Sequence, residues 1–272
     1  MSDMPPIKFL TTDEGEKIAY RQTAAKSGRP SFVWCGGLRS DMEGGKAIYL
    51  HNWARERGYG YIRFDYFGHG ESSGDFEVGT IGQWADDLLC VIDQLVSGPL
   101  ILVGSSMGGW AALLGALARP ERVQALLLIA PAPDFTQKLM WAGYSEDIRH
   151  TILTEGIYYE PSEYGEPMPI SRVLIEGGKA HLLLDGPIAF SGPVRILQGM
   201  KDTAVPYQHA FKIVEALESD DVTLTLIKSG DHRLSEPHDL ERLGRTAQTL
   251  IENVIDDLAR TKAVPTTCHS VG

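Results

Sequence analysis

A serine between glycines carries the clearest chemical signal in this sequence. Gly104, Ser106 and Gly108 form the pattern G-x-S-x-G, between the apolar run PLILV and the apolar run that begins GGW. In this pattern the central serine lies on a sharp strand-to-helix turn, where residues two positions away must be small to avoid a clash. We predict that Ser106 is a nucleophile and that Ser105 has no role in the chemistry. The alternative is a glycine-rich helix cap, which the flanking strand and helix patterns disfavour.

A serine hydroxyl needs a general base, and eight histidines are available. His232, in SGDHRLS, directly follows the last strand pattern and is the predicted base. His238 is the nearest rival, six residues further along, at the start of a predicted helix. His69 lies in a loop after an earlier strand and is another candidate for the same end of the sheet.

The base in turn needs an acid that orients it. Asp202, in GMKDTAVP, follows the penultimate strand pattern and fits the chain order serine, acid, histidine. Its alternative role is that of an ordinary turn aspartate. Asp134, in APAPDF, is a rival acid, whereas Asp231 is adjacent to His232 in sequence and is poorly placed to reach its ring.

Acyl transfer develops negative charge on a carbonyl oxygen, and two backbone N–H groups commonly receive it. One is expected from Met107, which follows the predicted nucleophile. The other is expected from Leu38, because Gly36 and Gly37 let the chain turn inward at the end of the strand SFVWC. The alternative is a plain Gly-Gly turn. Cys35, at the end of that strand, is expected to pack rather than react.

Short apolar runs alternate with longer amphipathic ones, which predicts βα units and a mostly parallel sheet with helices on both faces. Residues 1–130 and 193–260 are the predicted core of this α/β fold. Strands are predicted at 7–12, 17–22, 31–37, 59–66, 99–106, 123–131, 194–200 and 222–230, and helices at 45–58, 81–96, 108–118, 210–217 and 240–258.

Residues 131–192 break this alternation and show no clear strand pattern. A structureless loop of that length is improbable in a compact domain, so we predict a small helical cap over one end of the sheet. Apolar cap residues are the expected substrate pocket: Leu139, Met140, Trp141, Ile152 and Leu153. Arg149, Arg172 and Lys179 suggest attraction of an acidic substrate, or only solvated charges. Residues 261–272 are predicted to be a disordered tail.

The formal net charge is −11 and the pI is about 5.2, which disfavours nucleic acid and anionic membrane surfaces as partners. Three widely spaced cysteines form neither a disulfide framework nor a zinc pattern. We expect no metal and no cofactor. The chain begins without a signal-peptide pattern and contains no apolar run of membrane-spanning length, so a cytoplasmic location is predicted. The oligomeric state stays open.

Four motifs together resemble those of the alpha/beta-hydrolase superfamily. The segment FDYFGHGESSG (residues 64–74) carries D-x-x-G-x-G-x-S, and GSSMGGW, GMKDTAVP and SGDHRLS complete the set. Within the superfamily the chain is most similar to the branch of a mitochondrial acyl-glucuronide esterase and palmitoyl-protein thioesterase. No presequence is apparent, so that location is not carried over. The resemblance implies a cofactor-free hydrolase, with Ser106, Asp202 and His232 at the matching positions.

The main hypothesis is a carboxylesterase or thioesterase for medium to long acyl groups. Its substrate is a small-molecule ester or thioester, or an S-acylated protein. Two alternatives remain at this point: hydrolysis of a C–C bond in a diketone-type substrate, and a non-catalytic ligand receptor on the same fold.

Overall fold

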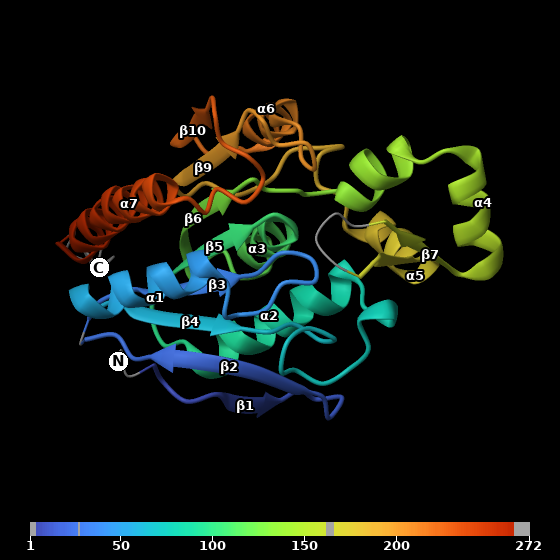
Figure 1. Ribbon diagram of the computed structural model, residues 1–272. Helices are drawn as coiled ribbons and strands as arrows, with labels where there is room; N and C mark the ends of the chain where they lie inside the picture. The colour runs from blue at the N-terminus through green and yellow to red at the C-terminus, as the bar shows by residue number, and fades with distance from the viewer. Residues whose placement is uncertain (1–3, 27, 162–165, 264–272) are drawn as a thin grey trace, which may run out of the picture.

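The computed structural model describes residues 4–26, 28–161 and 166–263. Its centre is an eight-stranded sheet in the order β1-β2-β4-β3-β5-β6-β9-β10 (Figure 1). The strands of this sheet are β1 (Lys8–Thr11), β2 (Lys17–Thr23), β3 (Ser31–Cys35), β4 (Gly60–Phe64), β5 (Leu100–Ser105), β6 (Val123–Ile129), β9 (Val194–Gly199) and β10 (Val222–Ile227). The α-helices that cover it are α1 (Gly45–Arg57), α2 (Ile81–Leu95), α3 (Met107–Ala118), α6 (Tyr207–Ala216) and α7 (Pro237–Ala263).

The strands from β4 to β10 pair in parallel, while β1 and β2 form an antiparallel edge next to β4. This confirms the predicted mostly parallel sheet. Because parallel strands end at the same side, the loops after β3, β5, β9 and β10 converge at one edge of the sheet. That edge is where the candidate active site lies.

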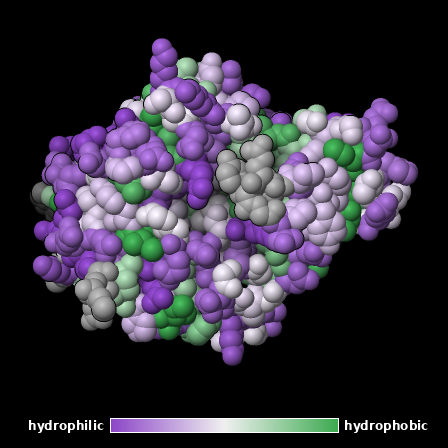
Figure 2. All heavy atoms as spheres, viewed as in Figure 1, coloured by the Kyte–Doolittle hydropathy of each residue, from purple (hydrophilic) through white to green (hydrophobic). Residues whose placement is uncertain are grey.

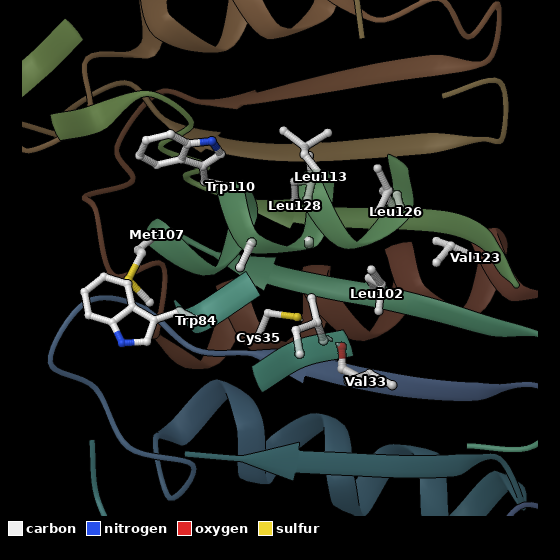
Figure 3. Packing of buried hydrophobic residues seen from close by; sticks show 14 of the residues in the cluster. Val33, Cys35, Trp84, Leu102, Met107, Trp110, Leu113, Val123, Leu126 and Leu128 are labelled. Carbon is white, nitrogen blue, oxygen red and sulfur yellow. Dashed lines mark hydrogen bonds between the residues drawn. The ribbon is translucent and has the colours of Figure 1, made fainter. Parts of the chain in front are cut away.

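The core has one hydrophobic cluster on each face of the sheet, as alternation along β5 illustrates. Leu100 and Leu102 point into the cluster under α2, α3 and α6, whereas Ile101 and Val103 point into the cluster under α1 and α7. Figure 3 shows the first cluster, where the large side chains of Trp84 and Met107 lie together. Both faces of the sheet are therefore covered, which explains the continuously apolar strands.

The insertion forms a cap beyond the carboxyl ends of the strands, at the right of Figure 1. It contains a short π-helix (Thr136–Trp141), α4 (Glu146–Glu155), α5 (Arg172–Gly178) and an antiparallel hairpin of β7 (Ile157–Glu160) with β8 (Met168–Ser171). The hairpin corrects the expectation of a purely helical insertion. Its strands have four residues each. The strand β7 is partly exposed, and β8, although mostly buried, contains a proline and ends in a serine, so neither produces the long apolar run by which the core strands are recognised.

Hydrogen bonds fasten the end of the cap to the core. The Trp110 indole N–H donates to the carbonyl of His181 at 3.0 Å. The Asp134 carboxylate accepts from the backbone N–H groups of Leu183 and Leu184, both at 2.8 Å. Asp134 is fully buried, so these bonds satisfy a charge that would otherwise be costly to bury.

The chain division at residues 131 and 192 stays a prediction. At the C-terminus, α7 extends through Ala263, and the rest of the predicted tail lies outside the described residues, together with Cys268. Among the helices of the described segments, none combines the length and the apolar character needed to cross a membrane.

Candidate active site

Ser106 lies at the sharp turn between β5 and α3. Its backbone adopts φ 55° and ψ −121°, a strained combination for a residue with a side chain. The turn is held by neighbours: the Ser106 N–H donates to the carbonyl of Ile129 at 2.9 Å, and its own carbonyl accepts from Gly109 and Ala132. This network compensates for the strain and keeps the hydroxyl above the end of the sheet.

Gly108 explains why the turn needs small residues. A Cβ atom built on it would lie 2.0 Å from the carbonyl oxygen of Cys35 and 2.4 Å from that of Gly36. The first turn of α3 therefore lies directly against the end of β3, and only glycine permits this approach. The close contact brings the loop after β3 next to Ser106.

Three predicted residues meet in one hydrogen-bonded chain. His232 Nε2 lies 3.1 Å from Ser106 Oγ, and His232 Nδ1 lies 2.8 Å from Asp202 Oδ2. A carboxylate can only accept, so Nδ1 carries the proton and Nε2 is left to accept from the serine hydroxyl. This is the tautomer that a general base for Ser106 requires.

The Asp202 side chain is fully buried, and each of its two carboxylate oxygens has its own set of partners. Its Oδ1 accepts from the N–H groups of Ala204 and Val205 at 2.9 and 2.8 Å, and its Oδ2 accepts from Gln198 Nε2 and faces His232. Asp202 is thus both a turn aspartate and a partner of the imidazole. The turn fixes the direction from which the carboxylate meets the ring.

The rival residues lie elsewhere. Asp134 anchors the cap, as described above. Asp231 accepts from the N–H of Leu234 at 2.9 Å. His238 is largely exposed and lies 3.4 Å from the carboxylate of Asp239, its neighbour in the chain. Ser105 is the last residue of β5 and is buried.

Two backbone N–H groups flank Ser106 as predicted donors for an oxyanion. Within the described part of the chain, neither the N–H of Leu38 nor that of Met107 donates a hydrogen bond to another protein group. A Cβ atom added to Gly37 would lie 3.5 Å from Ser106 Cβ, so the loop that carries Leu38 runs beside the serine. Their role as oxyanion donors remains a prediction.

His69 has a role that the sequence did not reveal. Its Nε2 accepts from the backbone N–H of Arg39 at 3.0 Å, while its Nδ1 lies 3.0 Å from the carbonyl of Phe67. A carbonyl only accepts, so the ring is neutral, with its proton on Nδ1. Burial lowers the pKa of His69, which favours this neutral form. The ring thereby fixes the peptide that immediately follows Leu38.

Arg39 itself connects this loop to the cap. Its backbone has φ 55°, and its Nη1 donates to the carbonyl of Pro167 at 2.8 Å and to that of Glu166 at 3.4 Å. The backbone of Arg39 is therefore held by His69 of the core, and its side chain is held by the residues of the cap that lead into β8.

A cavity of about 240 Å³ opens beside Ser106 and His232. The predicted pocket residues of the cap do not line it. Leu139 and Met140 pack against the main core, while Met140 and Trp141 pack around the small cap cluster that contains the fully buried Ile152. Leu153 is exposed. Their contact with substrate stays a prediction.

Two of the three cationic cap residues, Arg149 and Arg172, have local partners. Arg149 lies over the ring of Trp141 and donates to its carbonyl, and Arg172 lies 3.7 Å from the carboxylate of Glu176. Lys179 begins a short 3₁₀ turn next to α5. Hydrophobic residues come to the surface of the cap among hydrophilic ones (Figure 2). The side chains of Leu153 and Tyr159 are both exposed.

Cys35 is close to the site but is fully buried. Burial raises the pKa of its thiol to about 12, so it stays protonated at neutral pH and packs as a small apolar residue. Within the described segments, no group of three or more His, Cys, Asp or Glu side chains is arranged to hold a metal ion.

Known proteins share much of this sequence. A family model described as "Serine aminopeptidase, S33" matches residues 42–154. The mitochondrial palmitoyl-protein thioesterase ABHD10 of Pongo abelii is 37% identical over 250 residues, which are 91% of this chain and 81% of the relative. The chain belongs to the alpha/beta-hydrolase superfamily, in the branch of ABHD10. It is a hydrolase.

Solved structures agree with this assignment. A putative hydrolase from Agrobacterium vitis is 43% identical, with a TM-score of 0.86 over 90% of this chain and 99% of that one. Alpha/beta hydrolase domain-containing protein 10 from mouse is 36% identical, with a TM-score of 0.85 over 92% of this chain and 99% of that one.

The comparisons correct the predicted cytoplasmic location. The curated ABHD10 relatives, from Pongo abelii, Bos taurus, Homo sapiens and Mus musculus, are named as mitochondrial proteins. The cytoplasmic prediction rested on the absence of targeting and membrane-spanning patterns and was in keeping with cysteines that form no disulfide framework. Cysteines without a disulfide pattern are a weak indicator of compartment, because the state of a thiol depends on the local redox conditions and does not identify one particular compartment.

Proposed function

We propose that this hydrolase cleaves carboxylic esters or thioesters with medium to long acyl groups through a covalent acyl-enzyme on Ser106. The observation that carries the proposal is the hydrogen-bonded chain from Asp202 through the ring of His232 to Ser106 Oγ, with distances of 2.8 and 3.1 Å. The printed activity of the ABHD10 relatives, palmitoyl-protein thioesterase, supports the thioester and long-chain part of the proposal.

In the first step His232 Nε2 takes the proton of Ser106 as Oγ attacks the acyl carbonyl carbon. Asp202 stabilises the imidazolium that forms and keeps its orientation. The negative charge that moves onto the carbonyl oxygen is received by the N–H groups of Leu38 and Met107. The unused hydrogen-bonding capacity of both groups supports this role.

The tetrahedral intermediate then collapses. The bond between the acyl carbon and the leaving oxygen or sulfur breaks, and His232 gives its proton to the departing atom. A water molecule, deprotonated by His232, attacks the acyl carbon. The bond from that carbon to Ser106 Oγ then breaks, and His232 returns the proton to Oγ as the carboxylic acid leaves. No electrons are exchanged with a cofactor, so the residues described suffice for the cycle.

The test compares two adjacent serines. We expect Ser106→Ala to lower kcat for a p-nitrophenyl ester by at least about 10³-fold, since nucleophilic catalysis is lost, with an unchanged thermal midpoint. Ser105→Ala keeps most of the activity. A fluorophosphonate probe labels the wild type and Ser105→Ala but not Ser106→Ala. Equal loss in both variants would contradict the choice of nucleophile.

A second matched pair tests the base. His232→Gln should lose far more activity than His238→Gln, whose ring is exposed at the start of α7. Acetyl to palmitoyl p-nitrophenyl esters and an S-acyl peptide then measure the acyl length and the preference for thioesters. A diketone substrate, tested in parallel, should not be cleaved.

A further inference from the structure

Gln198 is a polar side chain in a strand whose buried neighbours are apolar. It lies in β9 on the same face of the sheet as Ile196, which belongs to the hydrophobic cluster under α2, α3 and α6. Gln198 is fully buried. Burying an amide costs free energy unless its polar atoms find partners. The partners of this side chain therefore indicate what it contributes.

The amide nitrogen of Gln198 faces three oxygen atoms around the loop after β9. Its Nε2 lies 3.1 Å from Asp202 Oδ2, 3.1 Å from the carbonyl oxygen of Val205 and 3.2 Å from that of Gly199. Carboxylate and carbonyl oxygens only accept hydrogen bonds, which excludes the flipped amide, whose own oxygen would face them. The side chain therefore connects the beginning and the end of the loop that carries the predicted acid.

The oxygen of the same amide has no such partner. Within the described segments, Gln198 Oε1 is buried and accepts no hydrogen bond. An apolar side chain of similar size would fill this space without leaving an acceptor unpaired, so the amide is not the choice that favours stability most. A residue that breaks a packing rule in this way is expected where function requires it.

Gln198 meets the predicted triad at one atom, Asp202 Oδ2. His232 Nδ1 lies 2.8 Å from this oxygen and Gln198 Nε2 lies 3.1 Å from it. Among the described residues, no ion pair links Asp202 to the charged side chains that line the cavity beside His232, which are Asp41, Lys46 and Arg233. Two donors therefore share one oxygen. A hydrogen bond to a carboxylate stabilises its charge, so the bond from Gln198 lessens the attraction of Oδ2 for the proton on Nδ1.

We propose that Gln198 is a positioning residue for the acid of the triad: it fixes Asp202 Oδ2 against His232 and moderates the strength of that oxygen as an acceptor. The inference rests on the proposed function of Ser106 and adds to it a residue that touches neither the substrate nor the reacting atoms. The backbone N–H groups of the turn fix Oδ1 of the carboxylate, and Gln198 fixes Oδ2. With both oxygens held, the imidazole ring stays directed at Ser106 Oγ.

Gln198→Met tests the proposal with a side chain of similar length that cannot donate a hydrogen bond. We expect kcat for a p-nitrophenyl ester to fall about tenfold, as for a modest misplacement of catalytic groups. Asp202 then attracts the Nδ1 proton more strongly and stabilises the imidazolium. The acidic limb of kcat/KM against pH should therefore move upward by about half a pH unit, part of the strength of a hydrogen bond to a charged group. A residue that only supported the fold would lower the thermal midpoint without moving this limb.

Gln198→Glu is the second variant, because it keeps the shape of the side chain and serves if Gln198→Met does not fold. Its carboxylic acid can donate to Asp202 Oδ2 only while protonated, and two ionised carboxylates at this distance repel each other. We expect the activity of Gln198→Glu relative to the wild type to fall as the pH rises, whereas the relative activity of Gln198→Met rises with pH. Relative activities that do not depend on pH would overturn the proposal.

Gln22→Met is the matched control. Gln22 lies in β2, near the opposite edge of the sheet, and its Nε2 donates to the carbonyl of Leu95 at 2.8 Å. The substitution removes a glutamine hydrogen bond far from the triad, so we expect kcat and the pH profile of this variant to match those of the wild type. A shifted acidic limb in Gln22→Met as well would contradict a specific role for Gln198.

A spectroscopic measurement separates failure of this inference from failure of the proposed function. The NMR resonance of the His232 Nδ1 proton can be followed in Ser106→Ala, where no turnover is needed. We expect the added Gln198→Met change to move this resonance downfield, because the hydrogen bond to Asp202 becomes stronger. If Ser106 is neither labelled by a fluorophosphonate nor needed for hydrolysis but the resonance moves, only the proposed function fails. If labelling persists and the resonance stays in place, only the role of Gln198 fails.

Discussion

At the scale of single residues, His69 shows how a side chain that takes no part in the reaction can hold a backbone segment next to the nucleophile. The loop that carries Leu38 has no regular structure to hold its N–H groups. The buried His69 ring supplies that constraint through one bond to the N–H of Arg39, and its neutral state is enforced by the second bond to Phe67. We regard His69 as a positioning residue for the predicted oxyanion donor.

Replacing His69 should therefore lower kcat more than it raises KM. In His69→Phe the ring shape is kept and the acceptor is lost, and we expect kcat to fall by about 10- to 100-fold, as for a modest misplacement of catalytic groups. His69→Gln retains an acceptor near the former Nε2 and should recover part of the loss. Steady-state kinetics with a neutral ester, together with the thermal midpoint, measure the effect. A KM increase without change in kcat would contradict the assignment.

Ser106, Asp202 and His232 could be predicted from the sequence because their chemistry restricts the residue type and its place after a strand. The structure brings these three side chains together in one hydrogen-bonded chain. His69 could not be assigned, since a bond from an imidazole to a backbone N–H thirty positions earlier leaves no pattern in the sequence.

At the scale of elements, the junction of β3 with α3 determines the geometry of the site. The strands and helices of the core were predictable because buried parallel strands are continuously apolar. The contact of Gly108 with the carbonyls of Cys35 and Gly36 was not, because it depends on how two elements cross. The cap hairpin was missed because its strands, of four residues each, are too short to produce a recognisable strand pattern.

Gly108→Ala should separate these two elements. The added Cβ meets backbone oxygens that cannot rotate away, so we expect a loss of about 1–3 kcal/mol in the free energy of unfolding. Esterase activity should fall further than stability alone explains, because the loop with Leu38 is displaced. Gly143→Ala is the control, since a Cβ there meets nothing within 4 Å. Urea unfolding and kcat/KM measure both effects, and equal behaviour of the two variants would contradict the argument.

At the scale of the whole molecule, buried carboxylates determine how stability depends on pH. Burial raises the pKa of Asp65 and that of Asp87 to about 6. Both accept backbone N–H bonds, Asp65 from Met42 and Asp87 from Phe67. The unfolded chain has an aspartate pKa near 3.9. Between these values the folded protein binds protons that the unfolded chain does not, so these two groups make folding more favourable as the pH falls from about 7 to 4.

Asp87→Asn tests this sign. The amide cannot ionise, so the gain in the free energy of unfolding between pH 7 and pH 4.5 should shrink in the variant. Asp93 supplies the opposite case, because its hydrogen bonds to Arg119 lower its pKa and its contribution is lost on acidification. Asp93→Asn should therefore shift the pH dependence the other way. Urea unfolding at both pH values provides the comparison, and identical slopes in all three proteins would refute it.

Arg39 connects the loop after β3 directly to the cap. Its guanidinium grips the carbonyls of Glu166 and Pro167, and its own peptide is the next along the chain from the N–H of Leu38. A rearrangement that moved residues 166 and 167 away from the core would break these hydrogen bonds. It would also remove a constraint on the backbone of Arg39, and with it on the neighbouring N–H of Leu38, so an opened cap and a positioned oxyanion donor would exclude each other.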